Sequence, residues 1–185
     1  IFEIKWDGYR AIGTVTKGKA DIRSRNDISF IHRYPPIVTA LENVETELVV
    51  DGEIVSLSEN GLPDFQNLQN WQKTRQGNLA YFIFDLLWID GYDITGLPLI
   101  ERKKILAEAL PQDGVIRYSD HIEAKGKDFF ELAKQQNIEG IIAKNKNSIY
   151  ELDARSRNWL KIKTTARQEA VVVGYTEPTG SRAYF

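Results

Sequence analysis

Seven stretches of the sequence have the alternating or continuously apolar pattern of β-strands. Side chains of a strand point alternately to its two faces, so each stretch predicts a strand with at least one buried face. This much strand excludes an all-helical fold and requires sheets. The stretches are residues 2–12 with a turn at Asp7-Gly8, and residues 46–57, 79–89, 114–118, 140–144, 159–163 and 169–175.

Four further segments have a helical pattern: residues 34–43, 64–76, 99–110 and 128–136. The first begins with Pro35-Pro36, and proline is favoured in the first turn of a helix. Strands and helices do not alternate regularly, so a doubly wound parallel sheet is not expected. The pattern favours an α+β domain of antiparallel sheets flanked by helices.

The composition limits the size of the fold and excludes several kinds of catalytic site. With 185 residues, 42% of them hydrophobic, the chain suffices for one domain, or for one domain and part of a second. Cysteine is absent, which excludes disulfides and thiolate catalysis and is compatible with the cytoplasm. His32 and His121 are the only histidines, leaving little for a histidine-based zinc site or a Ser-His-Asp triad. No apolar run is long enough to span a membrane.

The formal net charge of −2 argues against a surface that is positive throughout. Basic residues nevertheless gather in two runs, and such runs are either solvated faces or local surfaces for nucleic acid. The runs are Lys17, Lys19, Arg23 and Arg25, and then Arg155, Arg157, Lys161, Lys163 and Arg167.

Lys5 lies in the first strand-like stretch, EIKWDGYRAI. An isolated lysine on a strand usually points into solvent. Five later stretches provide a different context for it, although each alone would be an ordinary turn, helix end or amphipathic strand. They are RSRN at 23–26, DGEIV at 51–55, YFIFDLLWIDG at 81–91, EGIIAK at 139–144 and WLKIK at 159–163.

Together and in this order, the six stretches resemble the motifs of the covalent nucleotidyltransferases, which are the ATP-dependent DNA ligases, RNA ligases and mRNA capping enzymes. KWDGYR matches their nucleophile motif, Lys-x-Asp-Gly-x-Arg. The resemblance covers residues 2–175 and is greatest to the ligase domain of bacterial LigD-type enzymes. It departs at Asp153, where these ligases often have glycine two residues before RSR.

The resemblance implies that Lys5 attacks the α-phosphate of ATP. An amine attacks phosphorus only when neutral, and the ordinary lysine pKa of about 10.4 leaves it protonated at pH 7. Burial and neighbouring cations promote loss of the proton, and Arg10, Lys161 and Lys163 are the candidate neighbours. Their spacing places Lys161 and Lys163 on one face of a strand, as two phosphate-binding groups would require.

The resemblance also implies the contacts of the adenine base. Glu3 is expected beside the edge of the base, with Ile4 lining the same site. Phe84 is expected to stack on one face of the ring and Ile142 to cover the other. The alternative for Phe84 is an ordinary core residue. Asp85, which follows it, is expected to support the site structurally.

For the rest of the nucleotide, Arg10 and Arg25 match residues that hold ribose and phosphates. Glu53 matches a glutamate that contacts ribose and helps to hold metal, and Glu139 matches the metal-associated acid. Mg²⁺, with Mn²⁺ as an alternative, is the expected ion because carboxylates supply the hard oxygen ligands that it prefers.

The expected domains are a nucleotidyltransferase domain at residues 1–167 and, at residues 168–185, the beginning of an OB-fold domain. The chain starts without methionine and is expected to be part of a longer protein. Such a protein would be a monomer in the bacterial cytoplasm, acting at the nucleoid without membrane attachment.

The function implied is that of an ATP-dependent DNA ligase that forms lysyl-AMP and seals nicked or broken duplex DNA in repair, including non-homologous end joining. One alternative is an RNA ligase or a GTP-using capping enzyme. Another is a non-catalytic domain that binds nucleic acid through its basic runs alone.

Overall fold

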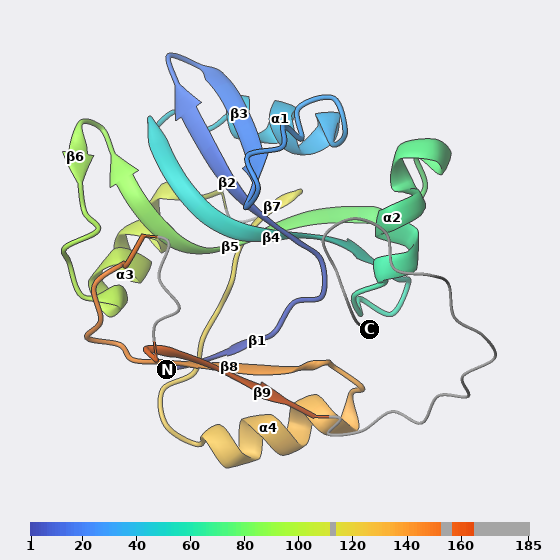
Figure 1. Ribbon diagram of the computed structural model, residues 1–185, viewed down its shortest axis with the longest axis vertical. Coiled ribbons are helices and arrows are strands. Elements are labelled where there is room, and N and C mark those ends of the chain that lie inside the picture. Colours follow the sequence, from blue (N-terminus) through green and yellow to red (C-terminus); the bar gives the residue numbers. More distant parts are fainter. Residues whose placement is uncertain (112–113, 153–156, 165–185) are drawn as a thin grey trace, which may run out of the picture.

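The computed structural model describes residues 1–111, 114–152 and 157–164, which form two sheets with helices outside them (Figure 1). In the larger sheet the strands lie in the order β3-β2-β4-β5-β6, and β7 pairs with β5. These strands are β2 (Tyr9–Thr16), β3 (Lys19–Ser24), β4 (Leu48–Leu57), β5 (Asn78–Ile89), β6 (Tyr92–Asp93) and β7 (Ile116–Tyr118). The smaller sheet has the order β1-β8-β9, with β1 (Phe2–Ile4), β8 (Gly140–Lys144) and β9 (Trp159–Lys163).

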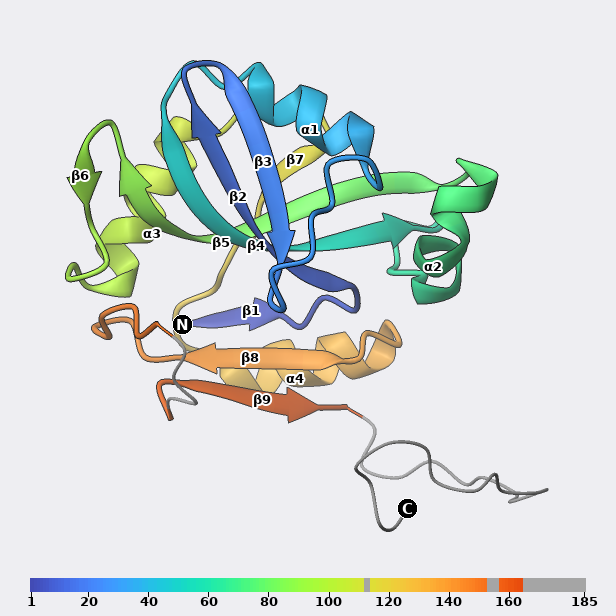
Figure 2. The same ribbon diagram turned by 45° about the horizontal axis from the view of Figure 1, so that its top comes forward.

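In the described residues, four helices cover the outer faces of the sheets: α1 (Pro35–Glu42), α2 (Phe65–Thr74), α3 (Leu99–Ala109) and α4 (Gly126–Gln135). Apolar side chains of α1 and α3 pack on the larger sheet in the main core, which includes Leu41, Ile83 and Leu106. A separate apolar cluster, with Ala133 and Ile141, joins α4 to the smaller sheet. The inner faces of the two sheets are therefore turned toward each other (Figures 1 and 2).

This architecture confirms the predicted α+β class, and among the described strands one pair departs from the antiparallel pattern. β5 and β7 run parallel, with Tyr81 opposite Ile116. The structure also adds β3, a strand that lies inside the first basic run. Its buried face carries Ile22, and on the exposed side Asp21 and Arg23 form an ion pair. Because of these charged residues, the segment lacks the apolar alternation from which a strand is predicted.

Asp7-Gly8 was predicted to be a turn within one strand region, and this prediction is wrong. The chain leaves the smaller sheet after β1 and enters the larger sheet at β2. Gly8 passes so close to β4 that a Cβ atom there would meet the Ile54 carbonyl oxygen at 2.0 Å. The glycine is needed for this close approach of two backbones, and Lys5 consequently lies where the chain crosses between the sheets.

The predicted strand at 169–175, the domain boundary at 167 and Asp153 lie outside the described residues. Among the described helices, none is both long and apolar enough to cross a membrane.

Candidate active site

Lys5 is fixed at the end of β1 by its backbone and by its side chain. Its amide N–H donates a hydrogen bond of 2.9 Å to the carbonyl oxygen of Gly140. Gly140 is the first residue of β8, the strand that lies next to β1. The ammonium group donates to the carboxylate of Glu139, and the lysine side chain is only 14% exposed. The predicted nucleophile and the predicted metal-associated acid are therefore in direct contact.

Glu139 also binds Lys163, whose Nζ lies 3.2 Å from Glu139 Oε1. The pairing of β8 with β9 causes this contact, because Gly140 lies opposite Lys163. Burial raises the pKa of Glu139, but hydrogen bonds from the two lysines outweigh burial and leave this pKa below its ordinary value. The site thus holds a carboxylate between two ammonium groups.

Lys161 lies two residues before Lys163, opposite Ile142 in the strand register. Both lysines are exposed, and their spacing places them on the same face of β9. Lys161 is close enough to Glu53 to lower its pKa electrostatically. Ile142 is partly buried and stands between Glu3 of β1 and Lys161 of β9.

Glu53 reaches the site from β4, on the larger sheet, where it lies opposite Arg10 of β2. Its pKa is raised to about 7, chiefly by burial and then by the charge of Asp51, while Lys5, Arg10 and Lys161 act in the opposite direction. At neutral pH Glu53 is therefore a mixture of the acid and the carboxylate when no ligand is bound.

The raised pKa of Glu53 predicts a pH-dependent stability. The unfolded chain releases this proton near the ordinary pKa of 4.5 and the folded chain near 7. The free energy of unfolding therefore falls as pH rises through this window, and the loss is complete above pH 7. Glu53→Gln should be more stable than wild type by roughly 1–3 kcal/mol at pH 8 and equal to it near pH 4.5.

Urea unfolding of both proteins at these two pH values, with EDTA to exclude metal, measures the effect. A stability difference that does not change between pH 4.5 and pH 8 would contradict the assignment of the titration to Glu53.

Arg10 is held by Asp51, which is fully buried on β4. The guanidinium donates two hydrogen bonds to this carboxylate, Nε to Oδ1 at 3.0 Å and Nη2 to Oδ2 at 2.6 Å. Its central carbon lies 5.9 Å from the ring centre of Phe84 and 6.0 Å from that of Trp159. Arg10 is thus fixed beside the predicted base-stacking residue, and its side chain remains 41% exposed.

Phe84 is only 7% exposed, because its neighbours cover it from the smaller sheet. The ring of Trp159 meets it edge-on with centroids 5.6 Å apart, and Lys144 Nζ lies 4.5 Å from its centre. It therefore belongs to the contact between the sheets. Stacking on adenine remains a prediction, and it requires that Trp159 or Lys144 move aside.

Glu3 is buried between two lysines that the sequence motifs did not single out. Lys103 Nζ lies 2.8 Å from Glu3 Oε1, and Lys144 Nζ lies 2.8 Å from Oε2. Burial lowers the pKa of Lys103, although Glu3 opposes this effect. Ile4 packs toward α4 with the apolar cluster of the smaller sheet, so its expected contact with the nucleotide also remains a prediction.

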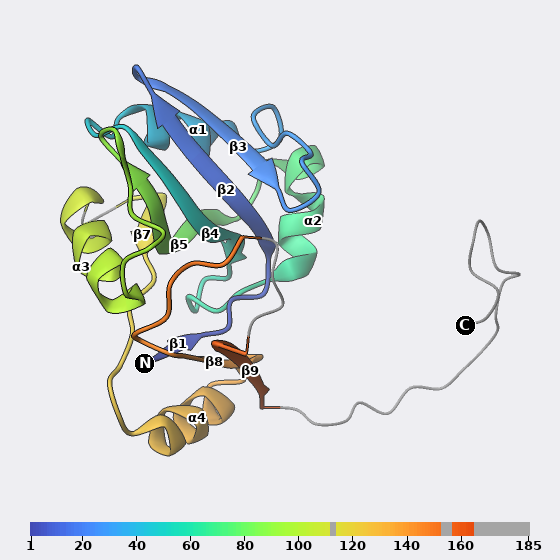
Figure 3. The ribbon, with the colours of Figure 1, turned by 60° about the vertical axis from the view of Figure 1, so that its left-hand side comes forward.

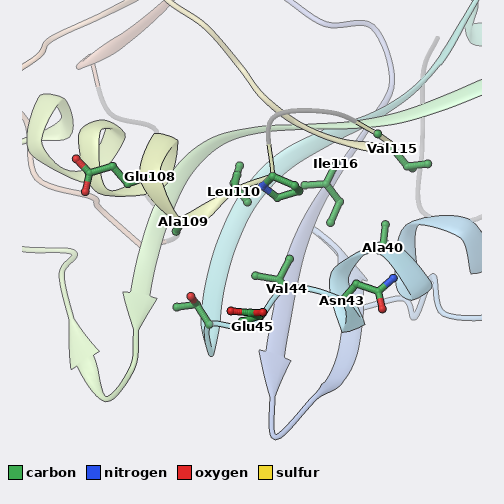
Figure 4. A pocket seen from close by; sticks show the side chains of 12 residues that line it. Ala40, Asn43, Val44, Glu45, Glu108, Ala109, Leu110, Val115 and Ile116 are labelled. Atoms are coloured by element: carbon green, nitrogen blue, oxygen red, sulfur yellow. The ribbon is translucent and has the colours of Figure 1, made fainter.

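Arg25 is exposed and follows β3. It lines a cavity of about 430 Å³ together with Arg10, Arg23 and Tyr150. The cavity places Arg25 near Arg10, and no direct contact joins Arg25 to Lys5 or Glu139 among the described residues. A second hollow of about 540 Å³, near the C-terminal ends of α1 and α3, contains no predicted site residue (Figure 4).

The carboxylates fit a weakly held divalent cation. Glu139 on the smaller sheet and Glu53 on the larger both interact with Lys5. In the described part of the chain, no group of three or more His, Cys, Asp or Glu side chains could hold a metal ion. Mg²⁺ commonly takes one or two carboxylates and completes its shell with water and phosphate oxygens, so the number of carboxylates at this site is compatible with it.

The site also contains five residues that the sequence motifs did not single out: Asp51, Lys103, Lys144, Tyr150 and Trp159. Asp51, Lys144 and Trp159 lie inside the motif stretches, so their positions in the sequence could have marked them as site residues. Lys103 and Tyr150 lie on α3 and on the segment after β8, and only the tertiary structure brings them in.

Two facing sheets with helices outside them, and a lysine where the chain crosses from one sheet to the other, agree with the nucleotidyltransferase fold that the family resemblance implies. Residues 1–163 match the family model for the ATP dependent DNA ligase domain, and the chain belongs to this family.

Among its relatives, "Multifunctional non-homologous end joining protein LigD" of Mycolicibacterium smegmatis is 36% identical over 183 residues. The alignment covers 98% of this chain and 24% of that protein. The protein of the same name in Pseudomonas aeruginosa is 36% identical over 187 residues, covering 99% of this chain and 22% of the relative. The chain therefore spans about a quarter of the length of these relatives.

A solved structure described as mycobacterial DNA ligase D complexed with ATP and MES has a TM-score of 0.78 to this chain at 31% identity. The superposition covers 88% of this chain and 53% of that one.

Proposed function

We propose that this chain is the adenylation domain of an ATP-dependent DNA ligase that acts on nicked or broken duplex DNA. The observation that carries the proposal is the position of Lys5, held at the crossing of the sheets by Glu139 with Lys163 on the same carboxylate. The names of the LigD relatives, which are bacterial proteins, support a role in non-homologous end joining. The proposed place of action is the bacterial cytoplasm.

In the first step, Lys5 Nζ attacks the α-phosphorus of ATP. The new N–P bond forms as the bond to the bridging oxygen breaks, so that lysyl-AMP and pyrophosphate result. Nζ needs a free lone pair for this attack, and Glu139 binds it through its protons. The ammonium group must therefore lose one proton to solvent before the attack and a second as the N–P bond forms, and a remaining proton can keep the contact with Glu139. Lys161 and Lys163 stand ready to bind phosphate oxygens.

Glu139 and Glu53 would hold the divalent cation, which neutralises charge on the α-phosphate and the pyrophosphate. Arg10, Phe84 and Glu3 would then contact ribose and base, as the family resemblance implies. In the later steps AMP passes to the 5′-phosphate of a nick, and the adjacent 3′-hydroxyl attacks that phosphate and releases AMP.

Intact-protein mass spectrometry after incubation with ATP and Mg²⁺ tests the first step. The expected result is a mass increase of one AMP. Incubation with GTP should give no adduct, and an adduct with GTP alone would point to a capping enzyme instead. The purified adduct should then transfer AMP to nicked DNA, whereas transfer to nicked RNA alone would identify an RNA ligase.

Glu139→Ala should slow adenylation by roughly 10- to 100-fold at limiting Mg²⁺, the usual cost of disturbing a metal environment. Because a weakened site can be filled by mass action, high Mg²⁺ or Mn²⁺ should restore part of the rate. The measurement is the rate of AMP addition over a titration of each metal.

Glu123→Ala is the matched control, since Glu123 forms an exposed ion pair with Lys146. It should leave both the rate and the metal dependence unchanged. If Glu139→Ala were slow at every metal concentration, its role would be to orient Lys5 rather than to hold metal.

A further inference from the structure

The segment of residues 145–152 crosses from the end of β8 to the larger sheet (Figure 3). Hydrogen bonds anchor it to α3 and to the segment between β6 and α3. The carbonyl oxygen of Ser148 accepts from the Leu99 amide at 2.9 Å and from Arg102 Nη1 at 3.1 Å. The Tyr150 amide donates to the Thr95 carbonyl oxygen at 2.9 Å. The backbone around Tyr150 is thereby held against α3 and the segment between β6 and α3.

The side chain of Tyr150 reaches the pair of Arg10 and Asp51. Its hydroxyl donates a hydrogen bond of 2.8 Å to Asp51 Oδ2, the oxygen that also accepts from Arg10 Nη2. Arg10 Nη2 in turn lies 3.4 Å from the tyrosine oxygen. Burial and the charge of Asp51 raise the pKa of Tyr150, so the hydroxyl keeps its proton and remains a donor.

Arg10, Asp51 and Tyr150 therefore form a closed ring of hydrogen bonds that spans three separate parts of the chain. Within the described residues, the hydrogen bonds of the Arg10 guanidinium go to the other two members of this ring. The hydrogen bonds of this ring occupy Nε and Nη2 of Arg10, and the other edge of the guanidinium remains open to a ligand. Fixing a long, flexible side chain in advance lowers the entropy that ligand binding must remove.

We propose that Tyr150 is a positioning residue of the nucleotide site, whose hydroxyl holds Arg10, through Asp51, in the orientation that receives the nucleotide. The inference rests on the proposed function, because Arg10 is expected to contact ribose and phosphates. Tyr150 touches no reacting atom in this scheme and acts only through Arg10.

Tyr150→Phe isolates the hydroxyl, because the ring and its packing against Trp159 are retained. Tyr92→Phe is the matched control, since Tyr92 is 71% exposed on β6. The first measurement is made without nucleotide. Arginine side-chain NMR spectra should show the Arg10 Nε–H signal, assigned from its loss in Arg10→Lys. This proton should exchange with water several-fold faster in Tyr150→Phe than in wild type, and at the wild-type rate in Tyr92→Phe. An unchanged rate in Tyr150→Phe would overturn the inference.

The second measurement is the rate of AMP addition against ATP concentration. Tyr150→Phe should raise the half-saturating ATP concentration by about five- to tenfold, within the range expected for the loss of one ordinary hydrogen bond, because the hydroxyl acts on the nucleotide only through Arg10. The maximal rate should change less than about twofold, as for lost binding contacts.

The same substitution in an Arg10→Ala background should have no further effect on half-saturation. A full effect there would show that Tyr150 acts independently of Arg10 and would overturn the inference. If wild type itself gained no AMP, the proposed function would fail, and the exchange of the Arg10 proton would still decide whether Tyr150 positions it.

Discussion

Lys5→Ala is expected to form no lysyl-AMP while keeping its fold. The variant lacks the attacking amine, and Glu139 retains Lys163 as an ionic partner, so no carboxylate is left unpaired. Intact mass spectrometry should show no added AMP even after long incubation with ATP and Mg²⁺. Thermal unfolding and equilibrium ATP binding should stay close to the wild-type values, because the residues expected to contact base and ribose are unchanged.

Lys5→Arg separates nucleophilicity from charge. Arginine keeps the ion pair with Glu139 but remains protonated at every accessible pH, so it should be equally inactive. Lys19→Ala, an exposed lysine on β3, should be fully active. An AMP adduct on Lys5→Ala would contradict the assignment and would move the nucleophile to Lys161 or Lys163, which peptide mapping would distinguish.

The second large effect is expected on the free energy of unfolding when a buried ion pair is broken. Arg102 and Asp85 form a bidentate ion pair at 2.8 Å for both contacts, and both side chains are fully buried. Arg102→Met leaves the Asp85 carboxylate buried without its cation, which should lower the free energy of unfolding by about 3–5 kcal/mol. Urea unfolding measures this loss directly.

The double variant Arg102→Met with Asp85→Leu should recover most of this stability, since removing both charges leaves none unpaired. Arg23→Ala removes an exposed ion pair with Asp21 and should cost less than about 1 kcal/mol. A single Arg102→Met variant as stable as Arg23→Ala would show that Asp85 is protonated or hydrated in the folded protein.

Local pattern was sufficient to predict several elements. β8 and β9 have the predicted bounds, residues 140–144 and 159–163, because continuous apolar or alternating residues end at polar ones on both sides. β3 was missed because its outward face carries the ion pair of Asp21 and Arg23. The crossing at Gly8 was mistaken for a turn, since a glycine required by a close neighbour and one required by a turn have the same sequence signature.

The candidate site was predicted only as far as the motifs reach. Lys5 and Lys163 both contact Glu139, so three residues from separate motifs lie together, and the roles that the family resemblance implies for them stay predictions. The buried partners of Glu3 could not be predicted, because Lys103 is one of several lysines and arginines on a helix and its burial depends on the packing of α3 against β5. The same is true of Tyr150, which is far in sequence from Arg10 and Asp51.

Lys5, Glu139 and Lys163 all belong to the smaller sheet or its edges, whereas Arg10, Glu53 and Phe84 belong to the larger sheet. A hinge motion that separated the two sheets would therefore carry the attacking amine, its carboxylate and the neighbouring ammonium group as one rigid unit. Nucleotide could enter and pyrophosphate could leave without dismantling this trio. The speed of such exchange would depend on the contacts that join the sheets, including Glu3 with Lys103, and could be altered without changing the chemistry at Lys5.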